Sequence, residues 1–186
     1  VQTCALPILR NKRILIVSPT ASGKSLIIYL ILRYLQHLDY KKGLLIVPTT
    51  SLVEQMFTDF KSYGYDSDTF CHRQYSGKDK HTNNLLTITT WQSIYKNPSD
   101  YFEQFDFVMG DEAHQFKAKS LTTILSGCIN ASYRIGTTGT LDGTQTHKLV
   151  LEGLFGPEYR ATSTKELMDK NQLANLKIKC LILDRK

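Results

Sequence analysis

Short apolar runs alternate with amphipathic segments along most of the chain. Five continuous apolar runs have the length and composition of strands that are buried on both faces of a parallel sheet. They cover residues 13–17, 43–50 (ended by Pro48), 85–89, 105–110 and 133–138. Three segments carry apolar side chains at spacings of three and four residues, which predicts helices with one buried face. They cover residues 27–38, 52–63 and 120–129.

This alternation of strands and helices predicts an α/β domain with a mainly parallel β-sheet, flanked by helices and joined by right-handed crossovers. Ser51 and Glu54 form an S-x-x-E pattern before the second helix, which predicts a capping box. The polar segment 76–84 reads as a loop or hairpin tip.

The two ends of the chain differ from its middle. Residues 1–9 have neither the charged start nor the long apolar stretch of a signal peptide, and we treat them as either non-native or unassigned. Residues 10–165 are expected to form one domain. Residues 177–186 read as a strand that simply stops, so we expect this sequence to be a fragment of a longer protein.

Composition narrows the class of protein. Hydrophobic residues make up 41% of the 186 residues and charged residues 22%, which is ordinary for a globular protein. No apolar run approaches the roughly 18–20 residues that span a bilayer, so we expect a soluble protein. The four cysteines lie far apart and indicate neither a zinc site nor a disulfide framework. A reducing cytoplasm fits this pattern best.

The formal net charge is +6. An excess of positive charge favours polyanions such as nucleic acid, although a merely solvated basic surface explains it equally well at this stage. Lys78, Lys80 and His81 in the polar loop are candidates for a basic face.

Residues 18–25, SPTASGKS, follow the first strand and precede the first helix. They match the phosphate-loop pattern G-x-x-x-x-G-K-[ST] except that Ser18 replaces its first glycine. In such a loop, Gly23 permits close backbone approach, Lys24 reaches the β- and γ-phosphates, and the hydroxyl of Ser25 binds Mg²⁺ at a helix N-terminus. The loop therefore predicts a site for the phosphates of a nucleotide and for Mg²⁺. Its nucleotide-binding residues are Pro19, Thr20, Ala21, Ser22, Gly23, Lys24 and Ser25.

DEAH, residues 111–114, follows another predicted strand. A phosphate-loop hydrolase needs a carboxylate at a strand end to hold Mg²⁺, which is the expected role of Asp111. It also needs a group to orient or deprotonate the attacking water, which is the expected role of Glu112. Lys24, Asp111 and Glu112 are thus the predicted catalytic residues, with Ser25 and Asp111 as metal ligands.

These blocks together resemble superfamily 2 helicases. Motif I is SPTASGKS, motif Ia is VPTTSLVEQ, the segment before motif II is TTWQSI, motif II is DEAH and motif III is TGT. They cover residues 18–25, 47–55, 89–94, 111–114 and 138–140. The pieces look most similar to a branch that contains the T4-type phage recombination helicases and the motor subunits of type I and III restriction enzymes.

The resemblance implies the first RecA-like lobe of an ATP-driven translocase that acts on single-stranded or branched DNA in phage recombination, replication or repair. It implies that residues 166–186 lead to a second RecA-like lobe that this sequence lacks. Motif residues would contact the DNA backbone, which carries no base sequence. They are Pro48, Thr49, Thr50, Thr90 and Gln92. For Thr90 and Gln92, capping near a strand end is the competing interpretation.

The resemblance also implies that a second set of residues couples nucleotide state to the other sites. This set comprises His114, Thr138, Gly139 and Thr140, with His114 also facing the nucleotide. A histidine held by a neighbouring hydroxyl, without a coupling role, is the alternative for His114. Trp91 could stack on a base, but a buried core tryptophan is the stronger expectation.

Two departures from the family pattern change the expected activity. Motif III reads T-G-T rather than S-A-T, which keeps its hydroxyls. The second departure is the absence of the second lobe, whose arginines stabilise charge on the transferred phosphoryl group and increase the rate about 10³–10⁵-fold. Residues 1–186 alone should therefore bind Mg-ATP weakly, hydrolyse it poorly and unwind nothing. Three alternatives stay open: a restriction-enzyme motor subunit, an RNA helicase fragment and a nucleotide-binding module without motor activity.

Overall fold

A computed structural model of the chain describes residues 12–19, 22–75, 84–139, 145–160, 162 and 164–169. Its centre is a seven-stranded sheet with the strand order β3-β4-β2-β5-β6-β1-β7. The strands are β1 (Arg13–Val17), β2 (Gly43–Val47), β3 (Cys71–Gln74), β4 (Leu86–Thr90), β5 (Phe107–Gly110), β6 (Tyr133–Thr138) and β7 (Glu158–Arg160). Every pairing between these strands is parallel, which confirms the predicted fold class.

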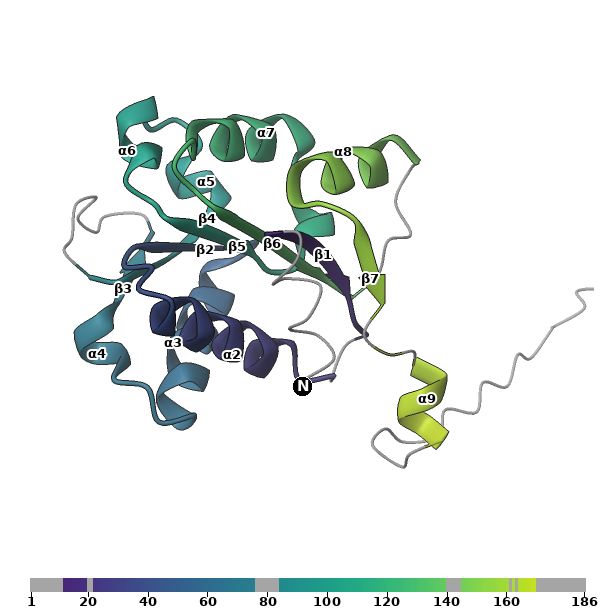
Figure 1. Ribbon diagram of the computed structural model, residues 1–186. Helices are drawn as coiled ribbons and strands as arrows, with labels where there is room; N and C mark the ends of the chain where they lie inside the picture. The colour runs from purple at the N-terminus through teal and green to yellow at the C-terminus, as the bar shows by residue number, and fades with distance from the viewer. Residues whose placement is uncertain are drawn as a thin grey trace, which may run out of the picture.

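Helices cover both faces of the sheet (Figure 1). One face carries α2 (Lys24–His37), α3 (Thr50–Ser62) and α4 (Ser67–Phe70). The other face carries α5 (Trp91–Ile94), α6 (Ser99–Glu103), α7 (Ala118–Gly127) and α8 (Gln145–Phe155). A short 3₁₀ helix, η1 (Ala113–Gln115), follows β5, and α9 (Thr164–Asp169) follows β7. In the described part of the chain, no helix is both long and apolar enough to cross a membrane.

The two helical layers enclose two hydrophobic cores. One core lies between the sheet and α2 and α3, and includes Ile14, Leu32 and Phe60. The other lies against α5–α8 and includes Leu15, Phe102 and Phe155. Alternate residues of one strand therefore enter opposite cores, which explains why the central strands are continuously apolar rather than alternating.

The structure corrects several expected details. Thr49, rather than Ser51, caps α3, because its side chain accepts a hydrogen bond from the N–H of Leu52. The capping-box interpretation is therefore wrong. The strand expected over 105–110 begins only at Phe107. Just before it, the carboxylate of Asp106 accepts the N–H groups of Lys41 and Lys42. Residues 1–9, most of the polar loop 76–84 and the strand expected over 177–186 lie outside the described residues.

Candidate active site at the carboxyl edge of the sheet

The predicted catalytic segments meet where three neighbouring strands end. The strands β5, β6 and β1 are adjacent and parallel, so their carboxyl ends open on the same edge. The phosphate loop leaves β1, DEAH leaves β5, and the motif III segment leaves β6. Ligands of open α/β sheets bind outside this edge, which makes it the candidate active site.

The phosphate loop is tied together by its own hydroxyl groups. Ser18 is only 1% exposed, its N–H donates to the carbonyl of Thr138 at 2.9 Å, and its Oγ donates to Ser22 Oγ at 2.7 Å. Gly23, just before α2, has φ 78° and ψ 34°, a left-handed conformation that glycine adopts at little cost. The serine in place of the pattern's first glycine thus closes the loop. Thr20 and Ala21 lie outside the described residues.

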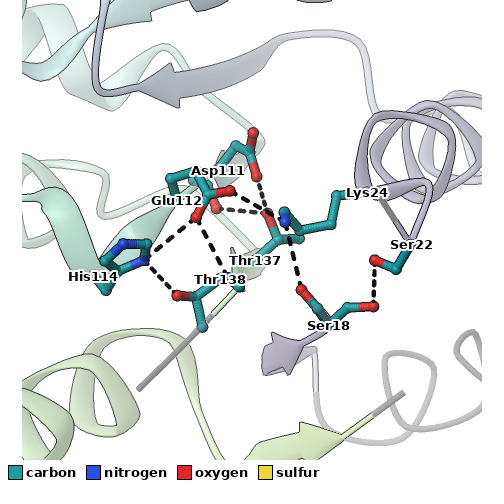
Figure 2. Close-up of polar contacts among 10 residues, drawn as sticks. Ser18, Ser22, Lys24, Asp111, Glu112, His114, Thr137 and Thr138 are labelled. Carbon is teal, nitrogen blue, oxygen red and sulfur yellow. Dashed lines mark hydrogen bonds and ion pairs between the residues drawn. The ribbon is translucent and has the colours of Figure 1, made fainter. Parts of the chain in front are cut away.

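Lys24 lies between the loop and the DEAH segment (Figure 2). Its Nζ is 3.1 Å from Glu112 Oε1, and the two side chains are only 10% and 18% exposed. The same ammonium group donates to the carbonyl of Ser18 at 3.4 Å. The cation is therefore held over the edge of the sheet by the loop on one side and by the DEAH carboxylate on the other.

Asp111 and Glu112 point in different directions, although they are adjacent. Asp111 is 3% exposed and accepts a hydrogen bond from Thr137 Oγ1 at 2.5 Å. Burial raises the pKa of the Asp111 carboxyl, against the opposing effect of that hydrogen bond. Glu112 has φ 50°, and this left-handed turn directs its carboxylate toward Lys24 and the N–H of Gly139, which donates to it at 3.3 Å.

His114 connects DEAH to the end of β6. Its Nδ1 lies 2.7 Å from Thr138 Oγ1 and 3.4 Å from Glu112 Oε2. Figure 2 shows the imidazole, the hydroxyl and the carboxylate as one connected set. The structure therefore brings together three of the four predicted coupling residues around the predicted base, whereas Thr140 lies outside the described residues.

The donor set at this edge fits Mg²⁺ and a polyphosphate. Mg²⁺ is usually held by one or two carboxylates together with substrate phosphates and water, and Asp111 and Ser25 offer a carboxylate and a hydroxyl. Among the described residues, no group of three or more His, Cys, Asp or Glu forms a self-contained metal cluster.

The predicted nucleic-acid residues also gather at the carboxyl edge, around the neighbouring strands β2 and β4. Gln92 Nε2 donates to the carbonyl of Pro48 at 3.4 Å, while Thr49 and Thr50 are exposed. Thr90 is only 4% exposed, and its hydroxyl lies 2.8 Å from Ser93 Oγ. Thr49, Thr50 and Gln92 are therefore accessible, whereas Thr90 is not.

Trp91 is half-buried and packs against the core on the α5–α8 side. The expectation of a buried core tryptophan is thus only partly correct. Its ring centroid is 5.8 Å from that of Tyr95 and 5.9 Å from Lys117 Nζ.

Sequence reasoning missed Thr137 and the tie between Ser18 and Ser22. A hydroxyl in an otherwise apolar strand was the available signal for Thr137, because a buried polar group needs a partner. No local signal pointed to the Ser18 hydroxyl, whose partner depends on how the loop closes.

Comparison with known proteins agrees with this geometry. The family described as Type III restriction enzyme, res subunit, matches residues 3–143. The chain is 35% identical over 177 residues to the ATP-dependent DNA helicase UvsW of Enterobacteria phage T4, a match that covers 93% of this chain and 35% of that protein. The chain thus spans about a third of the length of that relative.

Solved structures show the same fold. A crystal structure of the UvsW helicase from bacteriophage T4 superposes with a TM-score of 0.78 at 33% identity, covering 86% of this chain and 58% of that one. The helicase domain of Hef from Pyrococcus furiosus superposes with a TM-score of 0.68 at 20% identity, covering 86% of this chain and 38% of that one. At that lower identity the likeness concerns the fold alone.

Proposed function

Because this chain belongs to the type III restriction enzyme res subunit family and is the first RecA-like domain of a superfamily 2 helicase, we propose that it is the ATP-binding motor lobe of a DNA helicase or translocase. The whole protein would hydrolyse ATP to move on or unwind single-stranded or branched DNA in recombination, replication or repair. Its place would be the cytoplasm of a bacterial or phage-infected cell, where such DNA lies.

The ion pair between Lys24 and Glu112, with 3.1 Å between Nζ and Oε1, is the observation that carries this proposal. It joins the phosphate-loop cation to the candidate base at the edge where ligands of parallel sheets bind. A structural ion pair would not require Asp111 beside it, buried and facing Thr137, nor a left-handed turn at Glu112. The combination matches the needs of phosphoryl transfer to water.

Each residue then has a defined task. Lys24 exchanges the Glu112 carboxylate for phosphate oxygens, with help from the N–H groups at the start of α2. Glu112, released from the cation, accepts a proton from the attacking water. His114 and Gly139 hold that carboxylate in place. Ser25 and Asp111 would hold Mg²⁺, which neutralises charge on the phosphates when bound.

The nucleic-acid track is proposed to cross the carboxyl ends of β2 and β4. The exposed Thr49 and Thr50 and the Gln92–Pro48 contact support this location. A second RecA-like lobe of the parent protein would complete both the track and the ATP site. The +6 charge agrees with backbone contacts, which make affinity depend on salt.

A second candidate is the motor subunit of a restriction enzyme, which the description of the matching family favours. The described residues fit both candidates, because each uses a translocating lobe of this type. A nuclease or methylation module elsewhere in the parent protein would favour this second candidate.

The proposal is tested by measuring steady-state ATP hydrolysis by the full-length protein. One reaction contains no nucleic acid, and the others contain single-stranded DNA, branched DNA or RNA. We expect stimulation by DNA, strongest with branched DNA, and loss of turnover in Lys24→Ala and Glu112→Gln. Turnover that no nucleic acid alters would remove the motor assignment and leave a nucleotide-binding module. Stronger stimulation by RNA than by DNA would make the protein an RNA helicase.

A further inference from the structure

The hydroxyl of Ser25 has a partner outside the phosphate loop. Its Oγ lies 2.9 Å from the phenolic oxygen of Tyr63. Ser25 is the second residue of α2, and Tyr63 is the C-cap of α3. The two helices pack side by side on the same face of the sheet (Figure 1). A residue that the catalytic motifs do not include therefore contacts the predicted metal ligand.

Tyr63 is held in place by contacts that do not involve Ser25. Its N–H donates to the carbonyl of Asp59 at 3.0 Å, and its own carbonyl accepts the hydroxyl of Tyr29 at 3.2 Å. The rings of Tyr29 and Tyr63 lie with 5.3 Å between their centroids. The position of the phenol is thus set by the backbone of α3 and by a tyrosine of α2, so it can orient a neighbouring group.

The bond between Ser25 and Tyr63 is not needed to satisfy a buried group. Tyr63 is 36% exposed, so water could solvate its hydroxyl. In such a setting the net contribution of a hydrogen bond to folding is small. The bond therefore matters less for the stability of the fold than for the orientation of the Ser25 hydroxyl.

A serine hydroxyl has one proton and two lone pairs, and it rotates to suit its partners. Coordination of a cation uses a lone pair and strengthens the hydroxyl as a donor. An acceptor at a fixed position then holds the proton away from the metal and fixes the direction of the lone pairs. Hydrogen-bond partners behind metal ligands orient those ligands in this way in many metal sites.

We propose that Tyr63 is a positioning residue for Ser25, whose proton it accepts so that a Ser25 lone pair is free for the Mg²⁺ of the bound nucleotide. This inference rests on the proposed nucleotide site. Tyr63 would touch neither the phosphates nor the metal, and would act only through Ser25.

The test uses Tyr63→Phe in the full-length protein, with Tyr65→Phe as the matched control. Tyr63→Phe keeps the ring packing and deletes only the hydroxyl. Tyr65→Phe deletes a hydroxyl from the same segment that accepts from Gln36 Nε2 at 2.6 Å. The readout is binding of a fluorescent ADP analogue, titrated with Mg²⁺ and repeated in EDTA.

We expect Tyr63→Phe to raise the Mg²⁺ concentration at half-saturation about fivefold, as the loss of a hydrogen bond worth about 1 kcal/mol predicts. Affinity in EDTA should not change, and Tyr65→Phe should match the wild type. A general structural disturbance would instead weaken binding in EDTA as well. An unchanged Mg²⁺ midpoint, or a lower one because Tyr63 donates to Ser25 and competes with the metal, would overturn the inference.

A double-mutant cycle with Ser25→Ala checks the route of the effect. In the Ser25→Ala background, Tyr63→Phe should change the Mg²⁺ midpoint no further. A full fivefold effect in that background would show that Tyr63 does not act through Ser25. Absence of Mg²⁺-dependent nucleotide binding in the wild type is a different result, which would overturn the proposed function and this inference together.

Discussion

Lys24 Nζ and Glu112 Oε1 are 3.1 Å apart and largely shielded from solvent. The cation proposed to bind phosphate and the carboxylate proposed to activate water therefore neutralise each other. Burying either charge alone would be costly, whereas the pair is tolerated. At the proposed site, binding of ATP would replace this ion pair with another, so we expect the pair to influence both affinity and turnover.

Glu112→Gln should bind ATP more tightly and hydrolyse it more slowly. The neutral amide competes less with phosphate for Lys24, which predicts a gain of several-fold in ATP affinity. Loss of the general base predicts a fall of about 10²–10⁴ in turnover. Equilibrium binding and single-turnover hydrolysis measure the two effects separately. Weaker ATP binding in Glu112→Gln would contradict the view that the ion pair opposes the nucleotide.

The apolar runs were sufficient to predict the parallel sheet, because strands buried on both faces cannot alternate polar and apolar side chains. The motifs were sufficient to predict that Lys24, Asp111 and Glu112 meet at one edge. The sequence did not reveal the Ser25–Tyr63 contact or the bond from Thr137 to Asp111. These contacts depend on the helix packing and on the strand order, neither of which local periodicity encodes.

The short β3 was missed for a similar reason. Its sequence, CHRQ, has no apolar run, yet it pairs with β4 at the edge of the sheet. Partners supplied by tertiary structure can outweigh local β-propensity, particularly at an edge. Cys71 points into the core that lies against α2 and α3, and burial raises the pKa of its thiol to about 12.

Asp111→Asn should stabilise the nucleotide-free protein at neutral pH while removing the proposed metal ligand. Burial raises the pKa of Asp111 in the folded state, so the folded protein takes up this proton at a higher pH than the unfolded chain. Stability contributed by the group therefore falls as pH rises through the folded pKa. We expect Asp111→Asn to gain about 1 kcal/mol at pH 7–8, and the gain to shrink as the pH is lowered.

Thermal melts from pH 5 to pH 8 measure this dependence. Asp106→Asn is the matched control, because Asp106 accepts two backbone N–H groups at 2.9 Å and should lose about 1 kcal/mol of stability without its charge. A lower melting temperature for Asp111→Asn at pH 8 would contradict the prediction. That result would mean that the charged carboxylate is favourable where it lies.

Gly43→Ala should destabilise the protein by about 1–3 kcal/mol, the usual effect of overpacking a core. Gly43 pairs with Phe107 in the register of β2 and β5, and an added Cβ would overlap the buried Phe107 ring. Gly153→Ala in α8 is the control, because a Cβ there meets nothing within 4 Å. It should be neutral or stabilising by about 0.5–1 kcal/mol. Urea denaturation compares the two variants, and equal stability would contradict the packing argument.

Thr138→Val and His114→Ala should each reduce the stimulation of ATP hydrolysis by DNA about tenfold, in the range of coupling energies of about 0.5–2 kcal/mol. The reason is the 2.7 Å contact between His114 Nδ1 and Thr138 Oγ1, which links the DEAH segment to the end of β6. The measurement is ATP turnover as a function of DNA concentration. Thr123→Val is the control, because that exposed hydroxyl donates only to the carbonyl of Lys119 in its own helix.

Because the two residues share one contact, their double variant should lose little more stimulation than either single variant. Valine has nearly the shape of threonine, so Thr138→Val should remove the hydroxyl without opening a cavity at this fully buried position. Additive losses in the double variant would show that His114 and Thr138 act independently. Normal stimulation in both single variants would support the alternative role of His114, a histidine satisfied by a hydroxyl that transmits nothing.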